Sequence, residues 1–144
     1  MTENNAQQWL KILQTQGYRV TKPLKIIVDI VSKSNHILNP TQIFNIAREI
    51  YPKIGLVTVY RTVEKMEEAS LIERVHMPDG CHSFFQAADG HQHLLICTEC
   101  GKAEYFEGDN LNLLFNRIGE EFGYKITGHW LQLFGLCETC RKKY

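Results

Sequence analysis

Four of the five cysteines fall into two pairs of the form Cys-x-x-Cys, a spacing that indicates a metal site. Cys97 and Cys100 form the first pair, Cys137 and Cys140 form the second, and 36 residues separate the two pairs. A two-residue spacer lets both thiolates of one turn reach a single ion, so two such turns supply the four sulfurs of a tetrahedral shell. Zinc suits a closed shell of soft thiolates. The pattern therefore predicts one structural zinc in each chain.

Three other interpretations of these cysteines stay open: two disulfides, a redox-active pair, or four unrelated thiols in a core. A redox pair normally lies at the start of a helix and has one exposed thiolate of low pKa. Each pair here follows a segment with the pattern of a strand. A thiol redox protein that uses its CxxC pairs is therefore the alternative from another functional class. No nucleophile, base and oxyanion donor fall together in one segment, so the sequence does not predict an enzyme.

Length and charge allow one domain or two small ones. The chain has 144 residues and a formal net charge of zero. Residues 1–86 carry 10 Lys and Arg against 8 Asp and Glu, whereas residues 87–144 carry 6 against 8, so the cationic surface is expected in the first half. The start of the sequence lacks an apolar targeting segment, and no apolar run approaches the length of a membrane span. We therefore expect a soluble, cytoplasmic protein with reduced cysteines and no membrane partner.

The first half has the pattern of four short helices. Apolar residues recur at helical spacing over residues 6–13. Thr21 is predicted to cap the second helix, and Asn39, followed by Pro40, is predicted to cap the third. The fourth helix is expected over roughly residues 58–69. Its buried face is expected to carry Val59, Val63 and Met66, and its other face Thr58, Tyr60, Arg61, Glu64 and Lys65.

A β-hairpin is predicted directly after these helices. Residues 72–77 and 82–87 have strand patterns, and Pro78-Asp79-Gly80 between them has the composition of a tight turn. Helices followed by a hairpin form a winged helix-turn-helix, in which the last helix enters the major groove and the wing lies against the DNA backbone. A small α+β core without DNA binding is the other interpretation. We assign this domain to residues 1–86, with a hinge at about residues 87–91.

The second half, residues 87–144, is predicted to be a separate α/β domain. Strand patterns cover residues 93–97, 103–106, 125–127 and 130–136, and apolar residues between 111 and 122 mark an amphipathic helix. The last strand alternates apolar residues on both sides, so we expect two buried faces, one of them a candidate dimer interface. The predicted fold class is thus α+β: an N-terminal winged helix-turn-helix and a C-terminal α/β dimerisation domain with a four-cysteine zinc site.

Several segments together resemble the ferric-uptake-regulator (Fur) family of metal-dependent bacterial repressors, over nearly the whole chain. The matching segments are Gly17-Tyr18-Arg19-Val20-Thr21, Asn35-His36, Gly55-Leu56-Val57-Thr58-Val59-Tyr60-Arg61-Thr62, His91-x-His93, Cys97-x-x-Cys100-Gly101-Lys102, and His129 ahead of Gly135-Leu136-Cys137-x-x-Cys140. The resemblance implies a winged helix, a hinge, and a dimerisation domain with structural zinc. It also implies a homodimer in which a regulatory metal sets the spacing of the two DNA-binding heads.

By matching position, the resemblance assigns DNA contacts to Arg19, Thr58, Tyr60 and Arg61. Tyr60 and Arg61 would contact bases and backbone, with Thr58 nearby, and Arg19 would reach the phosphates. The chain departs from the family at Leu24, where an arginine is usual. The implied partner is double-stranded operator DNA, and no small organic substrate is expected.

The hinge metal site of much of the family lacks its ligands in this chain. Its five positions fall on Ile37, Phe85 or Gln86, Gln92, Leu94 and Tyr105, none of which is a good metal ligand. The iron-sensing and peroxide-sensing branches both rely on that set. An iron- or peroxide-responsive regulator is therefore the alternative rather than the main interpretation.

A second family site matches His91, His93 and His129. Its usual carboxylate falls on Asn112, so Asp109, one helical turn earlier, is our candidate for the fourth ligand, with Glu107 or water as alternatives. Three imidazoles and one oxygen suit zinc. The alternative is a solvated loop at residues 91–93 and a buried, hydrogen-bonded His129.

The predicted hairpin carries a possible further metal site, made of Glu73, His76, Cys81 and His82. Neighbouring strand residues point to opposite faces, so Cys81 and His82 would bind one ion only if the turn were distorted. A surface thiol beside a surface histidine is the other interpretation.

The main hypothesis is a zinc-sensing repressor, similar to the zinc uptake regulators of this family, that controls metal-homeostasis genes. It would hold one structural zinc per subunit and a regulatory divalent metal, for which zinc is favoured over iron or manganese.

Overall fold

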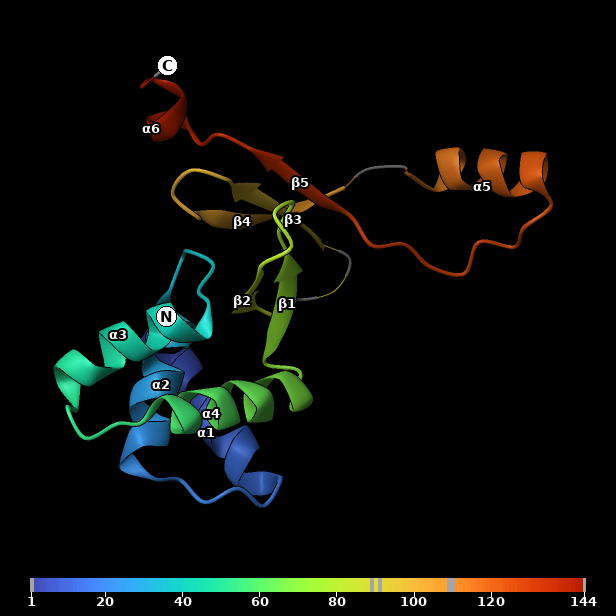
Figure 1. The fold of residues 1–144 in the computed structure, drawn as a ribbon. Coiled ribbons are helices and arrows are strands. Elements are labelled where there is room, and N and C mark those ends of the chain that lie inside the picture. Colours follow the sequence, from blue (N-terminus) through green and yellow to red (C-terminus); the bar gives the residue numbers. More distant parts are fainter. Residues whose placement is uncertain (1, 89, 91, 109–110, 144) are drawn as a thin grey trace. The chain divides into compact units, whose positions relative to one another are not determined.

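The computed structural model of the chain divides into two units, Met1–Ala87 and Ala88–Tyr144, which are described separately below (Figure 1). It describes residues 2–88, 90, 92–108 and 111–143. The predicted class is confirmed, since helices precede a hairpin in the first unit and a helix accompanies a three-stranded sheet in the second. In the described part of the chain, no helix is long and apolar enough to cross a membrane.

The first unit begins with four helices whose starts follow local capping rules. They are α1 (Thr2–Thr15), α2 (Lys22–Lys33), α3 (Pro40–Ile50) and α4 (Leu56–Glu68). The Thr21 hydroxyl accepts a hydrogen bond from the Leu24 N–H at 3.3 Å, as predicted for an N-cap. Asn39 and Gln42 form a reciprocal capping box at the start of α3, with bonds of 2.8 and 2.9 Å. Helix α4 starts two residues earlier than predicted, because Gly55 occupies its N-cap.

The helices of the first unit enclose a continuous apolar core. The side chains of Leu13, Ile27, Ile43, Val59 and Met66 are fully buried. The buried face of α4 is the predicted one, and α2 contributes its entire apolar stripe. Burying an aliphatic side chain contributes about 1.5–3 kcal/mol. A core of this extent fixes the exposed face of α4 without help from another chain.

A β-hairpin follows the helices, as predicted. Strands β1 (Ile72–His76) and β2 (His82–Gln86) are antiparallel, and His76 lies directly opposite His82. The turn is closed by bonds from the Met77 N–H to the Cys81 carbonyl (3.1 Å) and from the Gly80 N–H to the Met77 carbonyl (2.9 Å). Gly80 has a φ of 85°, a conformation that favours glycine.

The second unit contains a mixed sheet with strand order β4-β3-β5. Its elements are β3 (Gln92–Cys97), β4 (Ala103–Glu107), α5 (Leu111–Phe122), β5 (Gln132–Gly135) and α6 (Glu138–Arg141). Strand β3 is antiparallel to β4 and parallel to β5. Because β3 and β5 are parallel, their C-terminal residues lie side by side at one end of the sheet, as Figure 1 shows.

The prediction of a strand at residues 125–127 is wrong, because residues 124–131 form neither helix nor strand. Helix α5 ends at a left-handed Gly123 (φ 76°), and the Tyr124 N–H donates to the Gly119 carbonyl at 2.8 Å. Ile126 then lies close to Gly119 on α5. The chain therefore turns back along its own helix here instead of pairing with the sheet.

The expectation of two buried faces on the last strand is also wrong for the single chain. Leu133 and Phe134 of β5 are 43% and 40% exposed. Apolar side chains on α5 and on the segment before β5 are more exposed still, among them Leu113 at 72%, Phe122 at 66% and Trp130 at 64%. Leu133 and Phe134 are neighbours on the strand and point to opposite faces, so neither face of β5 is fully covered within the described chain.

Candidate metal centres and nucleic-acid interface

The four paired cysteines converge on one point, because the β3–β5 register sets them side by side. Cys97 ends β3 opposite Gly135 of β5, and the Thr98 N–H donates to the Gly135 carbonyl at 2.9 Å. The first pair turns back through a bond of 2.9 Å from the Gly101 N–H to the Cys97 carbonyl. Cys137 follows β5 as the N-cap of α6, a helix whose third residue is Cys140.

The sulfur positions fit a tetrahedral thiolate shell. All four lie within 4.8 Å of one another, and the sulfurs of Cys100 and Cys137 are 3.8 Å apart. A zinc–sulfur bond of about 2.3 Å gives a tetrahedron with sulfur–sulfur edges of about 3.8 Å. A disulfide would require about 2.05 Å, and all five cysteines are free thiols. The geometry therefore supports one four-sulfur metal site rather than two disulfides.

Local dipoles already favour charge on one of these sulfurs. Burial raises the pKa of Cys97, but N–H groups of Cys100, Cys137 and Glu99 point at its sulfur and lower the pKa to about 6. One of these bonds, from the Cys137 N–H, measures 3.3 Å. Burial and the neighbouring sulfurs raise the pKa of Cys140 to about 12. A bound cation would lower the pKa of both thiols, since thiolates that share one metal are all deprotonated.

The second unit also brings two of the three predicted histidine ligands together. The ring centres of His93, on β3, and His129, in the segment before β5, are 5.1 Å apart. A zinc ion lies about 2.1 Å from each imidazole nitrogen, so both rings are within reach of one ion. His93 is buried and His129 exposed, the opposite of the loop-and-core alternative. His91 and Asp109 lie outside the described residues; Glu107 and Asn112 are exposed.

Two neighbouring residues position this histidine pair, and neither was predicted for that role. A Cβ atom on Gly108 would lie 2.5 Å from Cδ2 of His93, so only glycine leaves room for the ring in this position. Phe115 of α5 stacks on His129 with ring centres 4.6 Å apart. Phe115 was already part of the predicted apolar stripe, but no sequence pattern marked Gly108.

Three of the hinge positions of the resemblance hold side chains that cannot bind a metal. Ile37, Phe85 and Leu94 are buried apolar residues. Gln86 uses its side-chain amide as a donor instead, to the carbonyl oxygens of Ser32 (2.7 Å) and Ser34 (3.1 Å) at the end of α2.

The hairpin residues predicted as a further site are divided by the strand register. His76 and His82 face each other with ring centres 5.0 Å apart. Glu73 pairs with Phe85, and Cys81 lies in the turn next to His82, so these two occupy alternate positions. Among the described residues, only the four paired cysteines form a group of three or more close metal ligands.

The predicted DNA contacts lie on and beside α4. Tyr60 is 52% exposed, Arg61 is exposed, and Thr58 is half-buried. The Tyr18 hydroxyl donates to the Glu68 carboxylate on α4 at 3.0 Å, which raises the pKa of Tyr18. This bond holds the loop after α1 against α4, and the next residue, Arg19, is exposed there. Leu24, which replaces the usual arginine, is a core residue.

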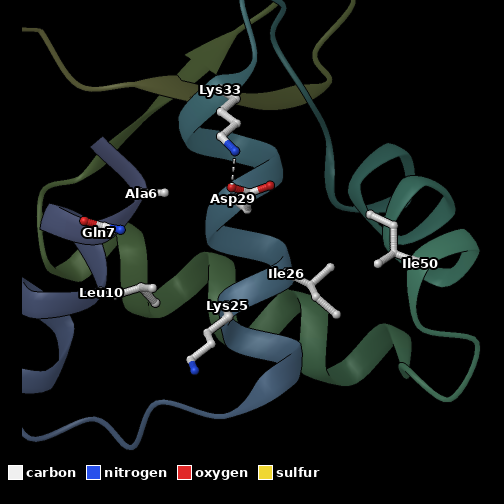
Figure 2. A pocket seen from close by; sticks show the side chains of 8 residues that line it. All are labelled: Ala6, Gln7, Leu10, Lys25, Ile26, Asp29, Lys33 and Ile50. Atoms are coloured by element: carbon white, nitrogen blue, oxygen red, sulfur yellow. Dashed lines mark ion pairs between the residues drawn. The ribbon is translucent and has the colours of Figure 1, made fainter. Parts of the chain in front are cut away.

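The hollow between α1, α2 and α3 contains none of the predicted site residues (Figure 2). It encloses about 560 Å³ and mixes apolar residues such as Leu10 and Ile26 with Lys25. Lys33 lies along α2 and pairs with Asp29 at 2.6 Å, as Figure 2 shows. Two of its three charged residues, Asp29 and Lys33, thus form an ordinary ion pair of a helix surface.

Comparison with known proteins identifies the family. The model of the ferric uptake regulator family matches residues 15–134. The ferric uptake regulation protein of Yersinia pestis is 36% identical, over 99% of this chain and 95% of that protein. The corresponding protein of Legionella pneumophila is 32% identical, over 90% and 96%.

Solved structures give the same result. A zinc-bound manganese uptake regulator has a TM-score of 0.74 and 26% identity, and the match covers 90% of this chain and 98% of that chain. A zinc uptake regulator complexed with zinc and DNA has the same fold, with a TM-score of 0.72 at 18% identity over 99% and 97% of the two chains. The chain therefore belongs to the ferric uptake regulator family, whose members are metal-responsive transcriptional regulators and not enzymes.

Proposed function

We propose that this protein is a zinc-responsive repressor that binds operator DNA as a homodimer and controls metal-homeostasis genes. The observation that carries the proposal is the approach of His93 and His129 to 5.1 Å. These imidazoles come from segments 36 positions apart (129 − 93), so their meeting reflects the fold and not the local sequence. Imidazole ligands suit zinc, whereas manganese and magnesium prefer oxygen.

The regulatory site would be completed by ligands taken over from the resemblance. His91 would supply a third imidazole, and Asp109, Glu107 or water would supply an oxygen. The bound regulatory ion would act by linking two segments of the chain, because its ligands would hold β3 to the segment that leads into β5. The four-cysteine site would hold one structural zinc per subunit.

Iron is the alternative regulatory metal, and it has one specific argument in its favour. The curated relatives at 31–36% identity include proteins named for ferric uptake regulation. Against iron, the positions of the family's hinge site are occupied by residues such as Ile37 and Leu94, which are buried and cannot coordinate. We therefore favour zinc, and the titration described below separates the two.

DNA binding is assigned to the first unit. We propose that α4 enters the major groove, with Tyr60 and Arg61 contacting bases and backbone and Thr58 nearby, and that Arg19 contacts phosphate. The zinc uptake regulator with the same fold was solved with DNA. Phosphate neutralisation supplies much of the affinity of such complexes, so binding should weaken steeply with salt.

Dimerisation is assigned to the domain predicted at residues 87–144, which corresponds to the second unit, Ala88–Tyr144. The exposed apolar side chains of α5 and β5 form a surface that a second copy would cover, and symmetric homodimers are the commonest soluble oligomers. Metal binding and DNA binding would then be linked, because an ion that selects one spacing of the two DNA-binding units raises the affinity for two matching half-sites.

The test is a metal titration of DNA binding by the purified full-length protein. Operator fragments are selected from random double-stranded DNA in parallel with zinc, iron(II) and manganese(II). Binding is then measured in chelator buffers that fix each free metal concentration. Activation by zinc at a free concentration far below those needed for iron or manganese supports the proposal, and metal-independent binding overturns it.

Two substitutions make this titration specific. His129→Ala should remove the zinc response while leaving the four-cysteine zinc in place. His36→Ala is the matched control, because His36 is a partly exposed histidine outside the proposed metal sites, with its ring 2.6 Å from the side-chain oxygen of Asn35. Arg61→Ala should reduce operator affinity with zinc content and dimerisation unchanged. An unaltered affinity in Arg61→Ala would show that α4 is not the recognition helix.

A further inference from the structure

We propose that the β1–β2 hairpin carries a separate transition-metal site, formed by His76 and His82 and selective for a borderline divalent ion such as zinc, nickel or copper(II). This site is independent of the four cysteines and of the His93–His129 pair. It goes beyond the proposed function, which uses neither histidine, and it narrows the four-residue hairpin site predicted from the sequence to these two residues.

The strand register places the two imidazoles as a chelating pair. His76 and His82 are directly opposed across the antiparallel ladder, so both side chains leave the ribbon on the same face. Their ring centres are 5.0 Å apart, and the ring planes are inclined at 82°. Both residues are exposed, so an ion can enter from solvent without opening the fold.

The frame that holds the pair is ordered on both sides. The turn between the two histidines is closed by the Met77–Cys81 and Gly80–Met77 backbone bonds and by a bond of 2.9 Å from the Cys81 N–H to the Asp79 carboxylate. On the other side, Arg74 of β1 forms two bonds with Glu67 of α4, at 3.0 and 2.9 Å. Less conformational freedom is therefore lost when the imidazoles bind one ion.

The surroundings favour a cation. His82 lines a groove of about 400 Å³ together with Tyr60, Glu64 and Glu67 of α4. Arg74 also lines this groove, but its charge is offset by the Glu67 carboxylate. Glu64 adds a second carboxylate to the groove. Cys81 and Glu73 occupy alternate positions and are not part of the site, so the two imidazoles supply the protein ligands and water fills the remaining positions.

The experiment uses the full-length protein with its four-cysteine zinc bound, and nickel(II) as the probe. Binding stoichiometry is measured by calorimetry, and each histidine is followed by carbethoxylation and mass spectrometry. We expect nickel to protect both His76 and His82 from modification while His36 stays reactive. The double variant His76→Ala/His82→Ala should bind one ion fewer per chain than the wild type, and His36→Ala should bind as many as the wild type.

Single variants test whether one ion bridges the two rings. In His76→Ala, nickel should no longer protect His82, and the affinity of this site should fall by about a hundredfold, because the second ligand no longer acts intramolecularly. Protection of His82 that persists in His76→Ala, or an unchanged stoichiometry in the double variant, would overturn the proposal. Both side chains are exposed, so thermal unfolding should not change, and the wild-type footprint decides the question even if a variant folds poorly.

Discussion

Helices α2 and α5 are each 12 residues long and each carry an apolar stripe, yet only α2 buries it within the chain. Helix α2 buries Leu24, Ile27, Val28 and Val31, whereas Gly119 is the one buried residue of α5. The first unit thus completes its core from its own helices. The second unit holds a four-sulfur cluster and leaves large apolar side chains exposed. An amphipathic pattern therefore predicts a helix, but it does not say whether the same chain supplies the covering surface.

The largest expected effect concerns the metal site of the second unit. Cys140→Ser should abolish zinc retention and unfold the second unit, because structural zinc binding contributes about 10–16 kcal/mol to such sites. The first unit should stay folded, since its core includes no zinc ligand. Zinc content and amide NMR signals assigned to each unit measure the two effects separately.

Cys81→Ser is the matched control for this variant, since Cys81 is an exposed thiol outside the cluster. It should retain zinc and both sets of signals. If Cys140→Ser also erased the signals of the first unit, the two units would not be energetically separate.

The second prediction compares apolar residues of the two units. Ile43→Ala, at a fully buried position, should lower the free energy of unfolding of the first unit by about 2–5 kcal/mol at any protein concentration. Phe134→Ala on β5 should destabilise only through association, so its effect should depend on concentration. Denaturation at two protein concentrations checks this difference. A concentration-independent loss in Phe134→Ala would contradict a partner-covered surface.

The third prediction concerns the support of the histidine pair. Gly108→Ala should displace the His93 ring and lower the affinity for the regulatory metal by about 10–100-fold, the range typical of residues that orient metal ligands. Gly128→Ala is the control, because a Cβ atom there meets no atom within 4 Å. Zinc affinity in competition with a chromophoric chelator provides the measurement. Equal affinities in the two variants would argue against His93 as a ligand.

The smallest effect is expected at the bond between the hairpin and α2. Gln86→Ala removes the two hydrogen bonds that the side-chain amide donates to the Ser32 and Ser34 carbonyls, and it should destabilise the first unit by about 1 kcal/mol. Gln16→Ala, at an exposed position after α1, should change stability by less than about 0.5 kcal/mol. Urea denaturation followed by circular dichroism resolves this difference. An unchanged free energy of unfolding in Gln86→Ala would show that water replaces the amide.

Local rules predicted the features that depend on neighbouring residues. Thr21 and Asn39 cap their helices as expected, because capping needs only a side chain and an N–H two or three residues away. The CxxC pairs predicted a shared site because each turn is itself local. The predicted α+β class followed from the same periodicities.

Features that depend on distant contacts were not predictable in this way. The segment at residues 125–127 has a strand pattern, but the return of the chain at Gly123 directs it along α5. Only the hairpin register shows that His76 meets His82 while Cys81 does not, because one residue of slip reverses every side chain. The requirement for Gly108 appears only once His93 is in place.

The parallel pairing of β3 and β5 has a consequence for how this region can change in evolution. The pairing of Cys97 with Gly135 sets where the two CxxC turns meet, so the length of the intervening segment is not what defines the cluster. Closing a flexible loop of twice the length adds only about 0.6 kcal/mol. Insertions and deletions within the α5 segment are thus tolerated by the sulfur cluster as long as the strand register survives, whereas a single-residue shift of β5 against β3 would separate the two pairs.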